Sequence, residues 1–350
     1  MVERISLAQG AGGELMDKLI KEKILVYFKQ DKSIEVPLTF MDDAAVIDDI
    51  VFSTDSHTVH PLIYPGGDIG SLAVSGTIND IAVMGAKPIA LSAGFIIEEG
   101  FSMETFETIV KSMGRCAQEA RVPIVTGDTK VVEKGAIQEF MVNTSGIGKR
   151  TTLLDDNIKE VKRHRKFTGR WLLDSNLKPG DQIIVSGNIA EHGIALLSFR
   201  EGYGFETTVK SDVAPLNDVM TKILTVGGVV SAKDPTRGGL ANTVNEYSEK
   251  SHVGIILSEE DIPISTGVQS ACGLLGLDPL EIGNEGKVVL GVVKEKAEEI
   301  LSALQKHPRG KHAAIIGSVT DKITGVVLET TVGGRRILHK PLGDPVPRIC

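Results

Sequence analysis

The chain has 350 residues, of which 41% are hydrophobic and 24% are charged, a balance that excludes a mainly disordered protein. Its length favours two domains, because a single domain usually has about 100–200 residues. The sequence has no run approaching the roughly 18 consecutive apolar residues of a membrane-spanning helix, so we expect no membrane insertion. The net charge of −8 argues against a nucleic-acid partner.

The cysteine content predicts a reducing compartment. Cys116, Cys272 and Cys350 are odd in number and lack the spacing of metal ligands, which favours free thiols. The N-terminus is charged from its third residue and lacks the apolar stretch of a signal peptide. We therefore expect a cytoplasmic protein.

Acidic residues are concentrated in one window of the sequence. Between Lys32 and Lys87 there is no Lys or Arg, and eight carboxylates account for the whole net charge. They are Glu35, Asp42, Asp43, Asp48, Asp49, Asp55, Asp68 and Asp80. Short carboxylates without cationic partners suit Mg²⁺, which proteins often hold through a few carboxylates and substrate phosphates. A single Asp is as readily a turn or cap residue, but the set predicts a metal site.

The first half of the chain alternates strand-like and helix-like segments. Residues 36–47 and 50–54 are rich in Val, Ile and Phe and predict strands with acidic tips. A turn at 65–70 opens a small-residue helix over 71–84, in which Gly76 and Asp80 share one face. The next expected element is a strand at 88–97. A helix should follow from its cap Ser102 to about Ala120, with Phe106, Ile109, Val110 and Met113 buried. Further strands are expected at 123–126 and 137–147.

A basic segment at 149–170 separates the two halves, and we interpret it as a linker or insertion. The second half predicts a strand at 182–186, a helix with Leu240, Val244 and Tyr247 on one face, and strands at 254–257, 287–293 and 313–319. The alternation is too irregular for a doubly wound sheet and predicts two α+β domains. We place them at 1–150 and 171–332, with the linker at 151–170 and a flexible tail at 333–350.

Two loops have residues suited to phosphate. Gly10, Gly12 and Gly13 lie in a glycine-rich loop whose backbone N–H groups could contact a phosphate, although the loop lacks the spacing of the known phosphate-binding motifs. The sequence at 127–130, Gly-Asp-Thr-Lys, places an Asp for metal and a Lys for phosphate at the end of a strand. Lys130 is equally explained as a surface lysine.

Two further residues could exchange protons. His192 is a candidate acid–base residue, although an isolated His is more often structural. Glu285 lies in an acidic glycine-containing turn at 283–287, which is as readily a plain loop as a catalytic one.

The C-terminal tail ends in a cysteine. Three prolines in the last ten residues, Pro341, Pro345 and Pro347, favour an extended chain that could hinge at Gly333 and Gly334. A terminal thiolate on such an arm is an accessible nucleophile. Its own α-carboxylate would raise the pKa of the Cys350 thiol, and Arg348 would partly offset this. The tail therefore suggests a carrier arm that is loaded in one place and processed in another.

Together these motifs resemble the AIR synthase-related (PurM-like) superfamily of ATP-using enzymes, and within it the HypE family of hydrogenase maturation factors. The resemblance covers nearly the full chain and is carried by residues 9–13, 42–46, 53–57, 65–88, 126–130, 234–240, 284–287 and 347–350. The final Pro-Arg-Ile-Cys is the part specific to the HypE family. Glu191 departs from the family's Asp-His-Gly pattern, and the segment 149–170 is longer and more basic than expected.

The resemblance implies a two-domain PurM-like fold and a homodimer that binds ATP near the subunit interface. It implies that a carbamoyltransferase, HypF, places a carbamoyl group on Cys350. The chain would then use ATP and Mg²⁺ to dehydrate this thiocarboxamide to a thiocyanate. The cyano group would pass to a HypC–HypD complex for the [NiFe] hydrogenase centre.

The same resemblance assigns roles to the candidate residues. Those expected to handle metal and phosphate are Asp43, Asp55, Asp80 and Asp128, and those expected to contact the nucleotide also include Gly10, Gly12, Gly13, Asn79, Gly127 and Asp234. Lys130 would neutralise the transferring phosphoryl group. Glu285 is the first choice of base and His192 the second. Two alternatives stay open: a related ATP-dependent enzyme acting on a small substrate (AIR synthase, selenophosphate synthetase or thiamine-phosphate kinase), or a non-catalytic nucleotide-binding scaffold.

Overall fold

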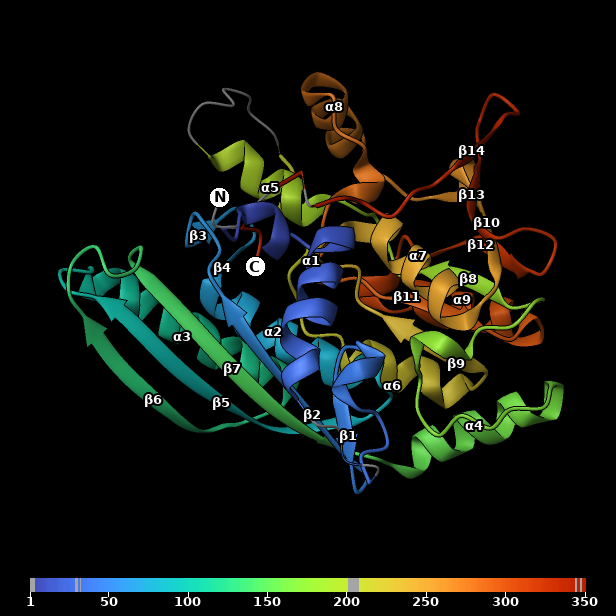
Figure 1. Cartoon of the computed structure of the whole chain (residues 1–350), viewed down its shortest axis with the longest axis horizontal. Coiled ribbons are helices and arrows are strands. Elements are labelled where there is room, and N and C mark those ends of the chain that lie inside the picture. The colour runs from blue at the N-terminus through green and yellow to red at the C-terminus, as the bar shows by residue number, and fades with distance from the viewer. Residues whose placement is uncertain (1–3, 29–30, 32, 201–207, 344, 347) are drawn as a thin grey trace.

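The computed structural model describes residues 4–28, 31, 33–200, 208–343, 345–346 and 348–350. Two α+β units lie side by side, each built on a mixed sheet with helices packed against it (Figure 1). The first sheet has the strand order β1-β2-β7-β5-β6, and the second has the order β14-β13-β10-β12-β8-β11-β9. The expected pair of α+β units is therefore confirmed.

The strands of the first unit are β1 (Ala45–Ile47), β2 (Ile50–His57), β3 (Ile63–Tyr64), β4 (Gly67–Asp68), β5 (Lys87–Glu98), β6 (Ile124–Val132) and β7 (Phe140–Lys149). Its helices are α1 (Gly13–Leu19), α2 (Ile69–Val83) and α3 (Met103–Ala120). The second unit has the strands β8 (Gln182–Val185), β9 (Val229–Lys233), β10 (Gly254–Ser258), β11 (Val289–Val292), β12 (Ala314–Thr320), β13 (Gly325–Glu329) and β14 (Arg335–Ile337). The remaining helices are α4 (Thr152–His164), α5 (Glu191–Phe199), α6 (Asn217–Val226), α7 (Gly239–Ser251), α8 (Thr266–Leu275) and α9 (Ala297–Gln305).

Helix α2 lies at the centre of the molecule. Asp68 caps it by accepting the Ser71 N–H at 2.9 Å, so the helix begins two residues before the expected start at Ser71. Its small and apolar residues are almost all buried, because α2 contacts β2, β7 and α3 of its own unit as well as α6 and β9 of the second. α2 therefore joins the two units through a continuous core.

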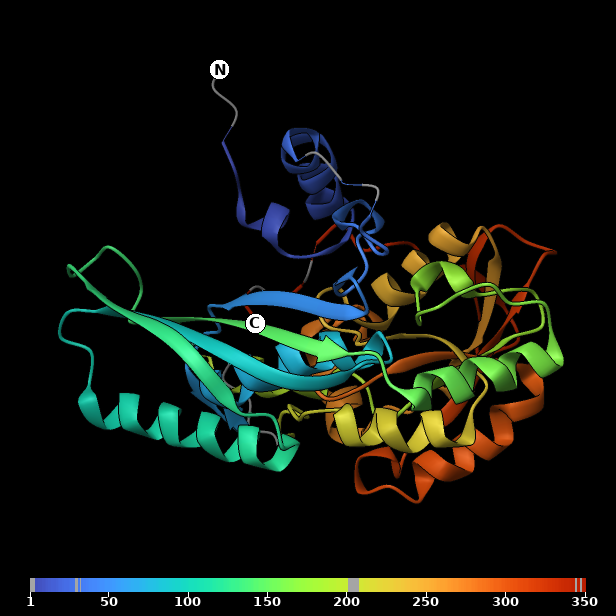
Figure 2. The same cartoon turned by 90° about the horizontal axis from the view of Figure 1, so that it is seen from below.

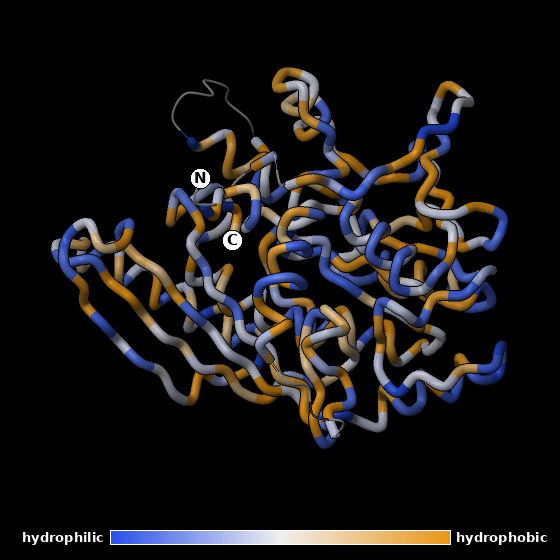
Figure 3. Tube along the Cα trace, in the orientation of Figure 1, coloured by the Kyte–Doolittle hydropathy of each residue, from blue (hydrophilic) through white to orange (hydrophobic). Residues whose placement is uncertain are grey.

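The helices α2 and α3 cover one face of the first sheet, and the other face is largely open (Figure 2). Phe52, Ile96 and Ile147 lie on this open face with 47%, 38% and 37% of their surface exposed. Strand β6 is exposed along almost its whole length. In Figure 3, hydrophobic residues lie along the strands of both sheets.

Three local expectations differ from the structure. Only Ala45–Ile47 of the expected strand 36–47 is a strand, because a 3₁₀ turn at Leu38–Phe40 follows Pro37 and ends at Met41, whose φ is +52°. Ser102 does cap α3, but Val110 is 37% exposed rather than buried. Most of the segment expected as a basic linker is folded as α4, whose Leu154, Ile158 and Val161 are buried against the second unit.

The tail is anchored beyond the expected hinge at Gly333 and Gly334. Strand β14 pairs with β13, Leu338 is 2% exposed, and its N–H donates to the Val326 carbonyl at 2.9 Å. The chain then runs back to the first unit and ends near the N-terminal segment (Figure 1). None of the helices in the described part of the chain is long and apolar enough to cross a membrane.

Candidate active site

A cavity of about 390 Å³ lies between the two units and brings together most of the predicted site residues. The first unit contributes the loop before α1, the residues before β1, the end of β2 and one face of α2. The second unit contributes the β9–α7 loop, the 283–287 turn and the end of the tail. The predicted residues that line this cavity are Gly12, Gly13, Asp43, Asp55, Asp80, Asp234, Glu285 and Cys350.

Asp55 and Asp80 lie on the same wall of the cavity. Asp55 lies on β2 and Asp80 on α2, where Ser53 donates to the Asp80 carboxylate at 2.5 Å. Gly76, one turn before Asp80, keeps this wall open, because a Cβ there would lie 3.2 Å from the His57 ring and 3.6 Å from the Asp55 carboxylate. Gly76 and Asp80 thus lie on one face of α2, as expected, and this face lines the cavity.

The cavity is strongly acidic. Burial raises the pKa of Asp80 well above its usual range, and Asp55 and Asp234 raise it further. Burial also raises the pKa of Asp234, with Asp43 as the next cause. Carboxylates that shift one another in this way favour a cation between them. No three His, Cys, Asp or Glu side chains of the described residues converge closely enough to hold a metal by themselves, so a cation here would also need ligands from phosphate or water.

Asp43 has a cationic partner that the sequence did not indicate. The Nζ of Lys233, at the end of β9, lies 2.5 Å from Asp43, 3.2 Å from Asp174 and 3.3 Å from Glu246. These carboxylates raise the pKa of Lys233 although its burial opposes this. The expectation that the acidic window lacks cationic partners is therefore wrong for Asp43, and also for Glu35 and Asp49, which both pair with Arg170.

Glu285 is held by its backbone, with part of its side chain unpaired. Its N–H and that of Gly286 both donate to the Asp212 carboxylate at 3.2 Å, and Asn79 donates to its carbonyl at 3.2 Å. The Oε1 atom is buried without a hydrogen-bond partner in the described part of the chain. Burial next to Asp234 and Asp212 raises the pKa of Glu285 well above its usual range. Asn79, expected to contact nucleotide, instead fixes this turn and does not line the cavity.

Cys350 lies at the wall of the cavity together with Arg237, whose positive charge interacts with its thiol. Burial raises the pKa of this thiol to about 12, although Arg237 opposes the shift. Arg348, the expected electrostatic partner, is used elsewhere, since its Nε and Nη2 donate to the Thr58 carbonyl at 3.0 and 2.7 Å. Arg237 precedes two glycines at the start of α7, a local signal of a tight turn that sequence reasoning did not connect with the tail.

The glycine-rich loop contacts the tail and the β9–α7 loop. A Cβ at Gly13 would collide with the Pro341 carbonyl, and one at Gly12 would lie 2.7 Å from the Arg237 Cβ. The neighbouring N–H of Glu14 donates to the Pro341 carbonyl at 3.0 Å. Gly10 lines a second cavity of about 500 Å³ on the other side of Cys350. The close approaches at Gly12 and Gly13 give these glycines a packing role, whereas their expected contact with phosphate stays a prediction.

Within one chain, Asp128 and Lys130 lie away from the cavity. Asp55, Thr144, Ala93 and Gly127 face one another across β2, β7, β5 and β6, and Thr144 donates to the Ala73 carbonyl of α2. Asp128 follows Gly127 and therefore points to the opposite face, three strands and about 14 Å from the position of Asp55. Lys130 and Asp128 form an exposed ion pair at 3.1 Å.

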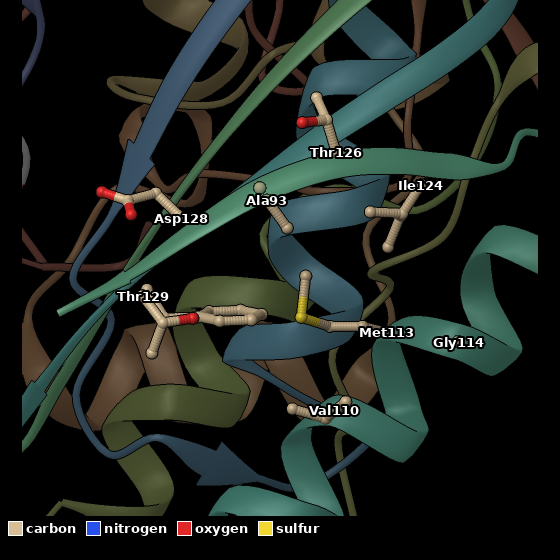
Figure 4. A pocket seen from close by; sticks show the side chains of 10 residues that line it. Ala93, Val110, Met113, Gly114, Ile124, Thr126, Asp128 and Thr129 are labelled. Atoms are coloured by element: carbon tan, nitrogen blue, oxygen red, sulfur yellow. The ribbon is translucent and has the colours of Figure 1, made fainter.

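Gly127 and Asp128 instead border a separate cleft of about 510 Å³ between β6 and α3. Figure 4 shows Val110 and Met113 of α3 on one side of this cleft and Ala93 and Ile124 on the sheet side. This gap leaves the helix side of β6 uncovered by α3, and its other side lies on the open face of the sheet, which together explain the exposure of the strand.

His192 does not line the main cavity. Its Nε2 lies 2.7 Å from the Ile349 carbonyl and its Nδ1 lies 2.8 Å from the Ser211 hydroxyl. It therefore contacts the tail backbone next to Cys350.

Two AIR synthase-related domains make up the chain. The family model of the AIR synthase related protein N-terminal domain matches residues 41–149, and that of the C-terminal domain matches residues 178–328. A thiamine monophosphate kinase from Aquifex aeolicus shares the fold at 17% identity and a TM-score of 0.61, over 92% of this chain and 97% of the kinase. The PurM-like architecture expected from the motifs is confirmed.

The chain belongs to the HypE family of this superfamily. It is 42% identical to carbamoyl dehydratase HypE of Azotobacter vinelandii, over 99% of this chain and 97% of the relative, and 40% identical to HypE of Escherichia coli K12 over the whole of both chains. A HypE chain solved in a HypE–HypF complex matches with a TM-score of 0.83 at 44% identity, covering 92% of this chain and 99% of that one. A HypE solved with ATP matches with a TM-score of 0.79 at 40% identity, covering 99% and 100%.

Proposed function

We propose that this protein dehydrates an S-carbamoyl group on its own Cys350 to a thiocyanate, with ATP as the dehydrating reagent, during hydrogenase maturation. The observation that carries the proposal is that Cys350 lines the same cavity as Asp55, Asp80, Asp234 and Glu285. The relatives named carbamoyl dehydratase and the HypE solved with ATP support the reaction type.

The chemistry needs ATP because oxide is a poor leaving group. The carbonyl oxygen of S–C(=O)–NH₂ attacks the γ-phosphorus, ADP leaves, and the nitrogen loses one proton. The resulting S–C(=NH)–OPO₃ group loses its second nitrogen proton as the C–O bond breaks. Phosphate departs and S–C≡N remains, so the sum is thiocarboxamide plus ATP giving thiocyanate, ADP and phosphate.

The acidic wall fits Mg²⁺, because burial and the neighbouring Asp55 and Asp234 raise the pKa of Asp80, and burial with Asp43 and Asp55 raises that of Asp234. These residues would hold the ion together with phosphate oxygens, and Asp43 would remain paired with Lys233. When bound, Mg²⁺ would neutralise charge on the phosphoryl group and lower the pKa of nearby carboxyl groups.

Glu285 is the proposed acceptor of the nitrogen protons, which its carboxylate takes one at a time and passes to the phosphate. It lines the cavity with Cys350, and its Oε1 has no hydrogen-bond partner among the described residues. The Arg237 guanidinium, which contacts the thiol, would hold the sulfur of the thiocarboxamide in place. His192 has no part in this step, because it lies outside the cavity and its Nε2 faces the Ile349 carbonyl at 2.7 Å.

The proposal includes a homodimer formed through the open face of the first sheet. This face combines the exposed Phe52, Ile96 and Ile147 with Asp128 and Lys130 at its edge. A twofold partner packed on this face would add the partner subunit's Lys130 and the partner subunit's Asp128 near the site. This would restore the phosphate-handling role that a single chain does not provide.

The tail must also reach other proteins, namely the carbamoyltransferase HypF that loads it and the HypC–HypD complex that receives the cyano group, all in the cytoplasm. The HypE–HypF complex of a relative supports the first partner. Glu14 holds the tail at Pro341, and the following Leu342 is 66% exposed, so we place the pivot of the undocked tail after Pro341. Nine residues from Leu342 would then reach about 28 Å, at ~3.1 Å each, against about 50 Å from Gly334.

Mass spectrometry of single-turnover reactions tests the proposal. Protein carbamoylated at Cys350 should lose the mass of one water, about 18 Da, on addition of Mg-ATP, and the Glu285→Gln variant should lose it much more slowly. A scaffold would show no mass change. A small-substrate enzyme would keep its ATPase activity when residues 349–350 are deleted.

A further inference from the structure

The imidazole of His192 connects the tail to the segment that supports Glu285. His192 is fully buried in the first turn of α5, and its Nε2 lies 2.7 Å from the Ile349 carbonyl. Its Nδ1 lies 2.8 Å from the Ser211 hydroxyl, and the Val213 N–H donates to the same hydroxyl at 3.1 Å. The ring is therefore held from both sides.

These contacts fix the protonation of the ring. A carbonyl oxygen only accepts hydrogen bonds, so Nε2 must carry the proton and donate to Ile349. In the neutral imidazole Nδ1 then has the lone pair, which accepts the Ser211 O–H. Burial lowers the pKa of His192, which keeps the ring neutral. Neither nitrogen has a lone pair left to take a proton from the group on Cys350.

We propose that His192 is a positioning residue that holds the docked tail by the Ile349 carbonyl and thereby places Cys350 in the cavity. This inference deepens the proposed function and rests on it for its catalytic consequence. Ser211 is followed by Asp212, whose carboxylate accepts the N–H groups of Glu285 and Gly286. The neighbouring residues Ser211 and Asp212 therefore hold both His192, which contacts the tail, and the turn that carries Glu285.

The surroundings of His192 are shaped for the tail. Ile349 and Val346 are 2% and 0% exposed in the docked position. A Cβ at Gly283 would collide with the Ile349 side chain, and one at Gly193 would lie 3.6 Å from Val346. Gly283 therefore leaves room for the apolar Ile349, as a specific docking site requires, and Val346 lies at an ordinary contact distance from Gly193.

The test compares His192→Gln with His192→Ala in the full-length, uncarbamoylated protein. A glutamine amide can still donate to the Ile349 carbonyl, whereas alanine leaves that carbonyl unpaired. The measurement is the rate of Cys350 alkylation by iodoacetamide, followed by peptide mass spectrometry. Cys116 and Cys272, both buried, report any general loosening of the fold in the same sample.

We expect His192→Ala to raise the alkylation rate at Cys350 about tenfold with unchanged rates at Cys116 and Cys272, and His192→Gln to stay within about threefold of wild type. Ser211→Ala, which frees the ring from one side, should give an intermediate rate. The rate of single-turnover dehydration should follow the reverse order, with His192→Ala the slowest.

Two results would overturn the inference. The first is wild-type alkylation of Cys350 in His192→Ala. The second is a His192→Gln variant that keeps Cys350 protected but loses dehydration as completely as the alanine variant, because the imidazole would then take part in proton transfer. Alkylation needs no ATP, so a failure of the proposed reaction in the wild-type protein is distinguished from a failure of docking.

Discussion

The Nζ of Lys233 lies 2.5 Å from the carboxylate of Asp43, and this ion pair joins the second unit to the first at the floor of the acidic cavity. The Lys233 side chain is 10% exposed and also contacts Asp174 and Glu246. Asp43 therefore depends on a cation from a distant part of the sequence, whereas Asp174 and Glu246 also pair with Lys250.

Replacing this cation should unfold the protein more easily. We expect Lys233→Met to lower the free energy of unfolding by about 3–5 kcal/mol, because it leaves the buried Asp43 carboxylate without its ion-pair partner. Chemical denaturation measures the effect, and Lys294→Met, at an exposed lysine, is the matched control. An equal loss in both variants would contradict the importance of the pair.

Asp80 should make stability depend on pH. Its pKa is raised in the folded protein above the value of 3.8, so the folded state prefers the protonated form, and stability is lost as pH rises above 3.8 towards the folded pKa. Asp80→Asn should therefore raise Tm at pH 8 by several degrees in metal-free protein. The gain should shrink as the pH is lowered towards 4, and thermal unfolding at both pH values checks it. A gain that is equal at both would show that the carboxylate is not the cause.

We expect tail docking to depend on Gly13 of the glycine-rich loop and not on Gly10. Gly13→Ala places a Cβ against the Pro341 carbonyl at a φ of +73°, whereas a Cβ at Gly10 meets nothing within 4 Å. We expect Gly13→Ala to slow single-turnover dehydration at least about tenfold, since strain of a few kcal/mol must be relieved by moving the loop or the tail. Gly10→Ala should react at nearly the wild-type rate. Equal rates for the two variants would remove the proposed contact.

The open face of the first sheet should control association. Phe52→Asp places a charge among exposed apolar residues of this face, and we expect it to weaken a homodimer by at least about tenfold in Kd. Sedimentation velocity over a dilution series measures this. Leu274→Asp changes another exposed apolar residue, on α8, and should leave association unchanged. A dimer that is unaffected by Phe52→Asp must use another surface.

The sequence predicted the parts of the site that depend on local patterns. The acidic window contains Asp43, Asp55 and Asp80, and the strand and helix periodicities placed β2, α2 and α3 close to their observed positions, because alternation and capping act over a few residues. The terminal cysteine needed no structure to be noticed. Residues 36–47 show the limit of this reasoning, since Pro37 and the left-handed Met41 interrupt an otherwise strand-like composition.

Only the tertiary structure decided which of these residues meet. Lys233, Arg237 and Asp212 come from the second unit, and no local pattern shows that they pair with Asp43, Cys350 and the Glu285 turn. Asp128 was assigned to the same site, but the two-residue period of β6 turns it to the opposite face of the sheet from Asp55. His192 changed from a candidate base to a tail-binding residue for the same reason: hydrogen-bond partners are set by the packing of distant segments, which a sequence read along its length does not reveal.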